Sequence, residues 1–191
     1  MMQKIPSALS AVLKGEPLPQ RAFLWVPAGW RAALHDCPTA LAQLEKLPAR
    51  IDRNDICTVV AENLDRDEVL SAFVPAMIWG YGDAGYGPDR VRWVLTGVKG
   101  KAAYASALNP GVEVRLMDAV GIVRGEGSVA GFRHMNNAGH IKHLGPAFFT
   151  KWLYFASAAS GPDDAQAAPI LDKQVKDWLA NGKSCVTGFS H

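Results

Sequence analysis

Apolar residues recur along most of this chain at intervals of three and four positions, the spacing that places them on one face of an α-helix. The pattern predicts helices over residues 40–47, 53–64, 66–79, 88–97, 101–108 and 112–127. Segment 66–79 is apolar on nearly every side, so we expect it at the centre of the core. The alternation typical of a strand is clearest over residues 23–30, and it is short there. The pattern therefore predicts an all-α fold with little or no β-structure.

The last third of the chain contains several sequence signals close together. Residues 140–144, then Gly145 and Pro146, predict a helix, a tight turn and a second helix, which together make a helix-hairpin-helix. A polar loop over 160–169 follows, and Asp172 stands where it can cap a last helix. We expect residues 1–191 to form a single compact helical unit, with the helix-hairpin-helix region at about 134–182. Two lobes with a cleft between them are the alternative organisation.

Charge and cysteine content narrow the classes of function. The formal net charge is only +2, so any site for a polyanion must be local. Three widely spaced cysteines match no zinc or iron–sulfur spacing, and the sequence indicates neither a metal nor a cofactor. With no apolar run long enough to span a membrane and no secretory signal, we expect a cytoplasmic protein. Nothing in the pattern indicates an oligomeric state.

Lys151 is the one charge between Leu144 and Ala159, on a segment rich in aromatic residues. Burial among aromatics disfavours the charged form of a lysine, and a neutral amine is a nucleophile. Asp172, 21 residues later, offers the carboxylate that such chemistry needs. The alternatives are a lysine whose ammonium group reaches water and an aspartate that only caps a helix.

The predicted hairpin also suits an anion. The free N–H groups at the start of a helix bind phosphate, and a glycine lets a ligand approach the backbone closely. Gly145 and Ala147 would supply this site, with Lys142 and His143 adding charge beside it. A plain turn between two helices is the alternative.

Together these residues resemble a known family. The segments LGPAFFTKWLYFA and PILDKQV, within residues 144–175, are similar to the helix-hairpin-helix DNA glycosylase superfamily, in its 8-oxoguanine DNA glycosylase branch. The likeness is to compact bacterial proteins of that fold, and FVPAMIWGYGDAGYGP, from Phe73 onward, extends it. The chain departs from the family's usual hairpin, which has two glycines where this chain has one.

The resemblance implies roles for particular residues. Lys151 matches the lysine that attacks C1′ of a damaged nucleoside and forms a Schiff base, which permits strand cleavage. Asp172 matches the aspartate that orients this nucleophile and stabilises positive charge on the sugar. Gly145 and its neighbours match the hairpin that grips a DNA phosphate.

The glycine-rich segment 79–88 contains the spacing G-x-G-x-x-G-x-G. Because it follows a predicted helix rather than a strand, we reject a dinucleotide site. The resemblance places it where such enzymes insert into the duplex, and Trp79, Tyr81 and Tyr86 are the candidates for insertion or stacking. Arg90 and Arg92 follow on the next predicted helix, where they could contact phosphates; a face that is only solvated is the interpretation we favour. The candidates for the wall of a base pocket, with packing in the core as their alternative, are Phe148, Phe149 and Trp152.

The first hypothesis is therefore a DNA glycosylase, with or without lyase activity, that removes an oxidised purine such as 8-oxoguanine from double-stranded DNA. The second is a nucleic-acid-binding module of the same fold with altered catalysis. The third is an enzyme that uses the same Lys/Asp pair on a modified nucleoside, as in phage defence.

Overall fold

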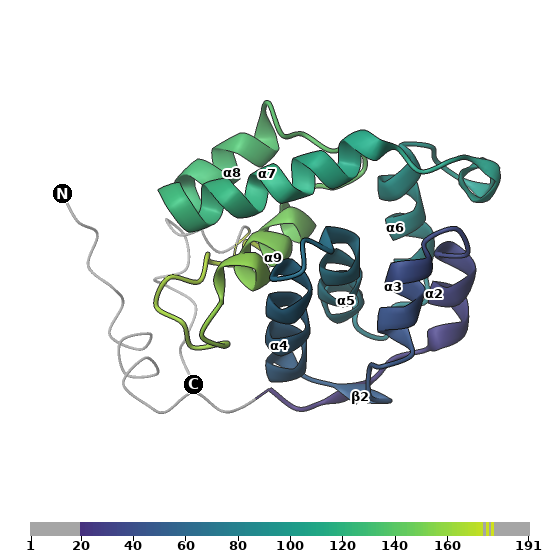
Figure 1. The fold of residues 1–191 in the computed structure, drawn as a ribbon, viewed down its shortest axis with the longest axis horizontal. Helices are drawn as coiled ribbons and strands as arrows, with labels where there is room; N and C mark the ends of the chain where they lie inside the picture. The colour runs from purple at the N-terminus through teal and green to yellow at the C-terminus, as the bar shows by residue number, and fades with distance from the viewer. Residues whose placement is uncertain (1–19, 174, 176, 178–191) are drawn as a thin grey trace, which may run out of the picture.

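The computed structural model describes residues 20–173, 175 and 177, and these fold mainly into α-helices (Figure 1). The order is β1 (Phe23–Leu24), α2 (Pro27–Ala33), α3 (Pro38–Leu44), β2 (Arg50–Ile51), α4 (Arg53–Leu64), α5 (Val69–Tyr81), α6 (Gly87–Thr96), the 3₁₀ helix η1 (Lys101–Ala105), α7 (Pro110–Glu126), α8 (Ser128–Asn136) and α9 (Pro146–Ser157). The prediction of an all-α fold is confirmed.

Helix α5 is the centre of the core. It packs against α3, α4, α6, α7 and α9, and its residues from Ser71 to Ile78 are all buried. This is what its continuous apolar sequence predicted. Pro75 lies inside α5, and the helix continues through it rather than breaking there. The last turn of α5 is the beginning of the glycine-rich segment 79–88. Because α5 packs against α9, it places that segment next to α9.

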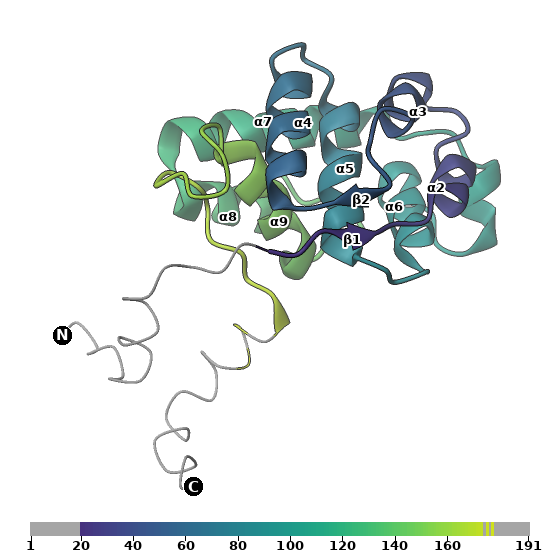
Figure 2. The ribbon, with the colours of Figure 1, turned by 90° about the horizontal axis from the view of Figure 1, so that it is seen from below.

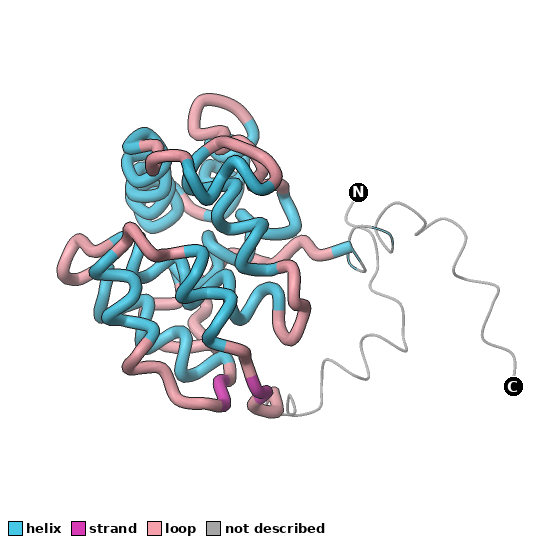
Figure 3. Tube along the Cα trace, turned by 90° about the vertical axis from the view of Figure 1, so that its right-hand side faces the viewer, coloured by secondary structure: helices cyan, strands magenta, loops and turns pink. Residues whose placement is uncertain are grey.

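The described β-structure is one pair of two-residue strands. β1 and β2 run antiparallel, with Phe23 opposite Ile51 and Leu24 opposite Arg50, and they lie side by side in Figure 2. Figure 3 shows how short the two strands are beside the surrounding helices. The predicted strand over residues 23–30 is therefore wrong beyond its second residue, because Pro27 begins α2, where its fixed φ suits a first helical turn.

Local capping explains several helix starts. Asp52 caps α4: it accepts a hydrogen bond from the backbone N–H of Asp55, whose side chain accepts one in return from the N–H of Asp52. Asp65 does not cap the next helix. It ends α4, and the chain reverses through Asp67, whose φ is +58°, before α5 begins at Val69.

The predicted helix over residues 140–144 is absent. Helix α8 ends at Asn136, and a loop leads from it to Gly145. Gly139 turns this loop tightly against α8, where a Cβ would collide with the imidazole of His134, and His143 takes a left-handed φ of +70°. The hairpin is thus α8, a loop of nine residues (137–145) and α9, and this longer loop carries Lys142 and His143.

Arg92 is fully buried, so its predicted place on a solvated face is wrong. Its guanidinium donates to both carboxylate oxygens of Asp36 and to the backbone carbonyl groups of Ala33, Ala103 and Ser106. These bonds tie together α2, α6 and η1. Arg92 therefore supports the fold and has no surface to offer a phosphate.

Candidate active site

Lys151 lies in the middle of α9 and is half-buried. Its Nζ donates a hydrogen bond of 2.8 Å to the backbone carbonyl of Gly80, in the last turn of α5. The same Nζ lies 4.6 Å from the centre of the Phe148 ring, one turn earlier on α9. The amine is therefore held between two helices rather than extended into water.

Gly80 is the residue that makes this position available. A Cβ there would lie 3.0 Å from Cδ of Lys151 and 3.6 Å from the Phe148 ring, so a side chain would press on the lysine. The carbonyl of Gly80 is neutral, and it orients the amine without adding a negative charge beside it. The sequence suggested no role for this residue, because its partner is 71 positions away.

The environment of Lys151 favours the neutral amine more than the environment of an exposed lysine does. Burial lowers the pKa of Lys151 below its ordinary value of 10.5, and the negative charge of Asp172 partly raises it again. The charge of Asp172 thus influences the amine, and a catalytic role for this pair stays a prediction. The Asp172 carboxylate also accepts a hydrogen bond of 2.8 Å from the backbone N–H of Val175, so it caps the start of the next helix as well.

Thr150 holds the segment before Asp172 against α9. Its hydroxyl donates to the carbonyl of Pro146 at 2.7 Å and accepts from the backbone N–H of Leu171 at 3.0 Å. Ser157 anchors the other end by accepting from the N–H of Ala168 at 2.8 Å. Sequence reasoning missed both, although a hydroxyl residue directly beside the candidate lysine was a signal. The two bonds place Asp172 relative to Lys151.

Thr150→Val is expected to weaken this arrangement. It removes the acceptor for the N–H of Leu171 at nearly constant volume, which should lower the free energy of unfolding by about 1–3 kcal/mol and leave Asp172 less well placed. Thr150→Ser keeps the hydroxyl and should stay close to wild type. Chemical denaturation measures the difference, and equal stability of the valine and serine variants would contradict it.

The start of α9 is where the sequence predicts an anion site, and that site stays a prediction. Gly145 is its N-cap and makes no side-chain capping bond, while Pro146 occupies the first turn. Gly145 is exposed and Ala147 half-buried; on the preceding loop Lys142 is exposed and His143 half-buried. These residues therefore lie at the N-terminal end of α9 and on the loop that precedes it.

The glycine-rich segment lies at the same end of the molecule. The Tyr81 and Phe148 rings are stacked, with centres 4.0 Å apart and planes at 21°, and the exposed Tyr86 meets Tyr81 edge-on. Trp79 points elsewhere: its Nε1 donates to Gln20, and its ring packs against Phe155. Phe149 and Trp152 are 1% and 0% exposed, so in this structure they support α9 from the core and line no open surface.

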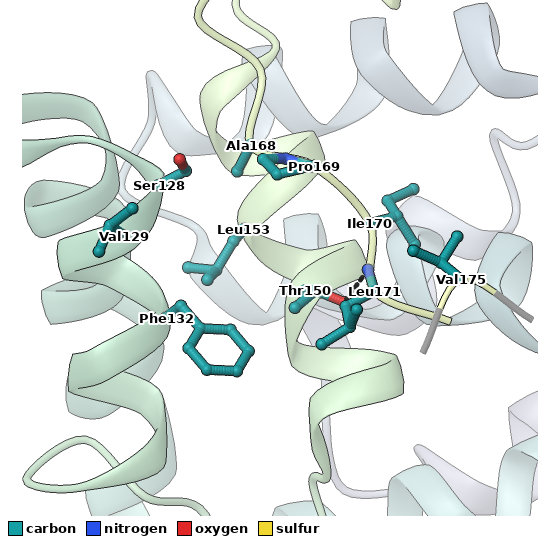
Figure 4. Close-up of a pocket in the computed structure, with 10 residues that line it drawn as sticks. All are labelled: Ser128, Val129, Phe132, Thr150, Leu153, Ala168, Pro169, Ile170, Leu171 and Val175. Carbon is teal, nitrogen blue, oxygen red and sulfur yellow. Dashed lines mark hydrogen bonds between the residues drawn. The ribbon is translucent and has the colours of Figure 1, made fainter. Parts of the chain in front are cut away.

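Two cavities are lined by residues of α9, and Lys151 is not among the lining residues of either. An apolar pocket of about 290 Å³ lies between α8, α9 and residues 168–171, and Thr150 and Leu171 line it (Figure 4). A cavity of about 600 Å³ at the end of α5 is lined by Tyr81 and Phe148, and the centre of the Phe148 ring is 4.6 Å from Nζ of Lys151. The second cavity therefore adjoins a ring that the amine contacts.

This arrangement can form a covalent bond to an electrophilic carbon. A partly desolvated amine that a carbonyl orients suits imine chemistry, and the charge of a carboxylate acts on it. No group of three or more metal-ligating side chains occurs within the described residues. Among those residues, no helix is long and apolar enough to cross a membrane.

Comparison with known proteins adds one finding. A family model described as "Putative 8-oxoguanine DNA glycosylase OGG-like protein" matches residues 16–189. Searches of the curated proteins and of the solved structures found no match. The matched range includes every residue of the candidate site described above.

Proposed function

Because this chain belongs to the 8-oxoguanine DNA glycosylase OGG-like family, we propose that it is a DNA glycosylase whose nucleophile is Lys151. The observation that carries the proposal is the position of the amine, half-buried and bonded to the Gly80 carbonyl. A lysine that served only solubility would extend into water. The substrate we infer is double-stranded DNA that contains an oxidised purine.

The chemistry can be written on the residues of this chain. The lone pair of the neutral Nζ attacks C1′ of the damaged nucleotide, the bond from C1′ to the base breaks, and the base leaves with the bonding electrons and takes up a proton. The nitrogen loses a proton, the C1′–O4′ bond breaks, and O4′ leaves with the bonding electrons and takes up a proton. The sugar ring is then open, with an imine between Nζ and C1′. Asp172 stabilises the positive charge that develops on the sugar. Loss of a proton from C2′, which the imine acidifies, would then form the C2′=C3′ double bond as the C3′–O bond breaks, so that the 3′ phosphate leaves with the electron pair and the strand is cut.

The DNA backbone would be held at the start of α9. The free N–H groups near Ala147 and the side chains of Lys142 and His143 suit a phosphate. Base extrusion costs a few kcal/mol, which contacts to the backbone and to the base must offset. Because these contacts displace counterions, we expect the affinity for duplex DNA to fall steeply as salt concentration rises.

Borohydride trapping tests the proposal directly. The protein is incubated with duplexes that carry 8-oxoguanine, other oxidised purines or no lesion, and separately with a modified nucleoside, and then reduced. A stable protein–DNA adduct with a lesion duplex supports the glycosylase. Tight binding without adduct or base release would instead favour the binding module, which the departure from the family's usual hairpin sequence at Gly145 makes the second candidate. An adduct only with a modified nucleoside would favour the third hypothesis, an enzyme of phage defence.

The pH dependence of adduct formation follows from the lowered pKa of Lys151. Only the neutral amine attacks, so the rate should rise with pH and reach half its maximum below pH 10.5, the ordinary pKa of a lysine. The measurement is the initial rate of trapping in single-turnover reactions across pH 6 to about 10. A midpoint at or above the ordinary lysine value would show that the amine is not desolvated in the working enzyme.

Asp172→Asn separates the electrostatic role of this residue from its capping role. Asparagine caps a helix about as well as aspartate, so the fold and the affinity for DNA should be kept. The rate should fall by roughly 10²–10³-fold, the usual loss when one preorganised stabilising group is removed. Loss of the carboxylate should also move the pH midpoint of the residual rate downward, because the charge of Asp172 raises the pKa of Lys151. If the variant unfolds instead, capping was its main role.

A further inference from the structure

The pocket between α8 and α9 is lined almost entirely by apolar side chains. Figure 4 shows Val129 and Phe132 of α8 on one side of it and residues 169–171 on the other. Val129 is 61% exposed within this lining. Exposed apolar surface around a hollow is typical of a place that another group covers.

The size and chemistry of the pocket suit one large aromatic side chain. A cavity of about 150 Å³ holds benzene, so the volume of about 290 Å³ here has room for two fused rings. Only Ser128 and Thr150 of the lining residues have a polar side chain, and the Thr150 hydroxyl already bonds to the backbone of Pro146 and Leu171. The pocket therefore favours an apolar occupant.

The continuation of the chain provides such a side chain. Val175 lines the pocket, and it lies in the last turn that the structure describes, just after the cap at Asp172. In the sequence Trp178 and Leu179 stand three and four positions after Val175, within residues 178–191 that follow the described part. This is the spacing that places side chains on one face of a helix. A helix that continued from Asp172 would therefore carry Trp178 on the same face as Val175.

The charged residues of this turn show which face is turned to water. Lys173 and Asp177 form an ion pair four positions apart, with side chains 86% and 50% exposed. Val175 stands between them in the sequence and faces the pocket. At 100° per residue, the face of Lys173 and Asp177 is nearly opposite to that of Val175, Trp178 and Leu179. Such a division is typical of a helix that packs by one face.

We propose that the indole of Trp178, from the chain's own C-terminal segment, occupies this pocket and that Leu179 covers its edge. Because the tether is only a few residues long, the effective concentration of the indole is in the millimolar range, which disfavours competing molecules.

Docking of Trp178 would also act on the candidate site. The hydrogen bond between Thr150 and Leu171 lies in the pocket wall, and a hydrogen bond shielded from water is electrostatically stronger. Asp172 follows Leu171 directly, so the docked segment would help to position its carboxylate. This consequence rests on the proposed function, whereas the docking itself does not.

The test of docking follows the fluorescence of Trp178. Emission spectra and quenching by acrylamide are measured for the full chain and for Trp178→Phe, and the difference between the two reports Trp178. The same pair is compared in two further backgrounds. Val129→Asp places a charge in the pocket wall, and Val114→Asp, at a similarly exposed valine on α7, is the matched control.

We expect Trp178 to emit at a shorter wavelength than free tryptophan amide and to be protected from acrylamide. Val129→Asp should abolish both effects, and Val114→Asp should leave both unchanged. Emission like that of free tryptophan in the unmodified chain, or emission that Val129→Asp does not change, would overturn the docking. A shift that disappears on dilution would also overturn it, since the pocket would then hold the segment of a second copy.

Trp178→Ala tests the positioning role. A displaced Asp172 should slow adduct formation with lesion-containing DNA by roughly 10²-fold, the loss that a misplacement of about 1 Å can cause. The pH midpoint of the rate should move downward, because the charge of Asp172 raises the pKa of Lys151. Trp178→Phe keeps a large ring and should preserve the midpoint.

Other outcomes separate this proposal from the glycosylase proposal. A lower yield of adduct with an unmoved midpoint in Trp178→Ala would reflect loss of folded protein and would overturn the positioning role. An exposed Trp178 in a wild type that still forms the adduct would overturn the docking and leave the glycosylase proposal standing. Protected Trp178 emission in a wild type without any adduct would do the reverse.

Discussion

Lys151→Gln is expected to abolish the borohydride-trapped adduct with lesion-containing DNA while the protein still folds and binds duplex. Glutamine is close to lysine in length and can still donate to the carbonyl of Gly80, so the packing between α5 and α9 should persist. It has no nucleophilic nitrogen, because the lone pair of an amide is delocalised. The expected loss is therefore one of chemistry, with trapping reduced to background.

The matched control is Lys142→Gln. Lys142 is exposed on the loop before α9 and carries the same charge, so its removal tests the loss of one cation near the DNA. This variant should keep the adduct and lower the affinity, with a salt dependence reduced by about one ion. If Lys151→Gln still forms the adduct, another amine is the nucleophile and the proposed site is wrong.

Arg92→Leu is expected to destabilise the protein by about 3–5 kcal/mol, the usual effect of removing one partner of a buried ion pair. The Arg92 side chain is fully buried and bonds to both oxygens of Asp36, at 2.5 and 3.0 Å, as well as to three backbone carbonyl groups. Leucine would leave the three backbone carbonyl groups without this donor, and the Asp36 carboxylate, 32% exposed, without its charge partner. Arg92→Lys should be only a partial rescue, because an ammonium group cannot reproduce the planar fork of a guanidinium.

Chemical denaturation of the purified variants measures this effect. Arg31→Leu is the control, since Arg31 also pairs with a carboxylate, that of Glu45, but at the surface with both side chains more than half exposed. An exposed pair of this kind contributes little, so the unfolding midpoint should hardly move. Similar midpoints for the Arg92 and Arg31 variants would show that the buried network does not hold α2, α6 and η1 together.

Lys151 and Arg92 also show which features could be predicted from the sequence. The periodicity of apolar residues predicted most of the helices and the central place of α5, because both depend on contacts that a segment makes with one continuous core. Asp52 was identifiable as a cap because its partner, Asp55, is three residues away. The lysine among aromatics and the aspartate after the polar loop were identifiable as a candidate pair for the same reason: the unusual residue types stand out locally.

Other features were misread where a distant partner decides the outcome. Arg92 had the sequence context of a surface residue, and only its pairing with Asp36, 56 positions away, makes burial tolerable. Residues 140–144 had a helical pattern, but the turn at Gly139 against His134 ends the helix earlier. Trp152 had the character of a binding residue, and its packing against Phe73 of α5 places it in the core.

By itself, then, the amino-acid sequence determined the helical class of this protein. It also pointed to Lys151 and Asp172 as candidates for chemistry. Both inferences depend on residues that are close together in the chain. The tertiary structure decided what those residues can do. Gly80 and Phe148 hold the Lys151 amine, Thr150 places the segment before Asp172, and three separate segments enclose the apolar pocket beside α8. These effects depend on desolvation and on hydrogen bonds between segments far apart in the chain, which come together only when the helices pack.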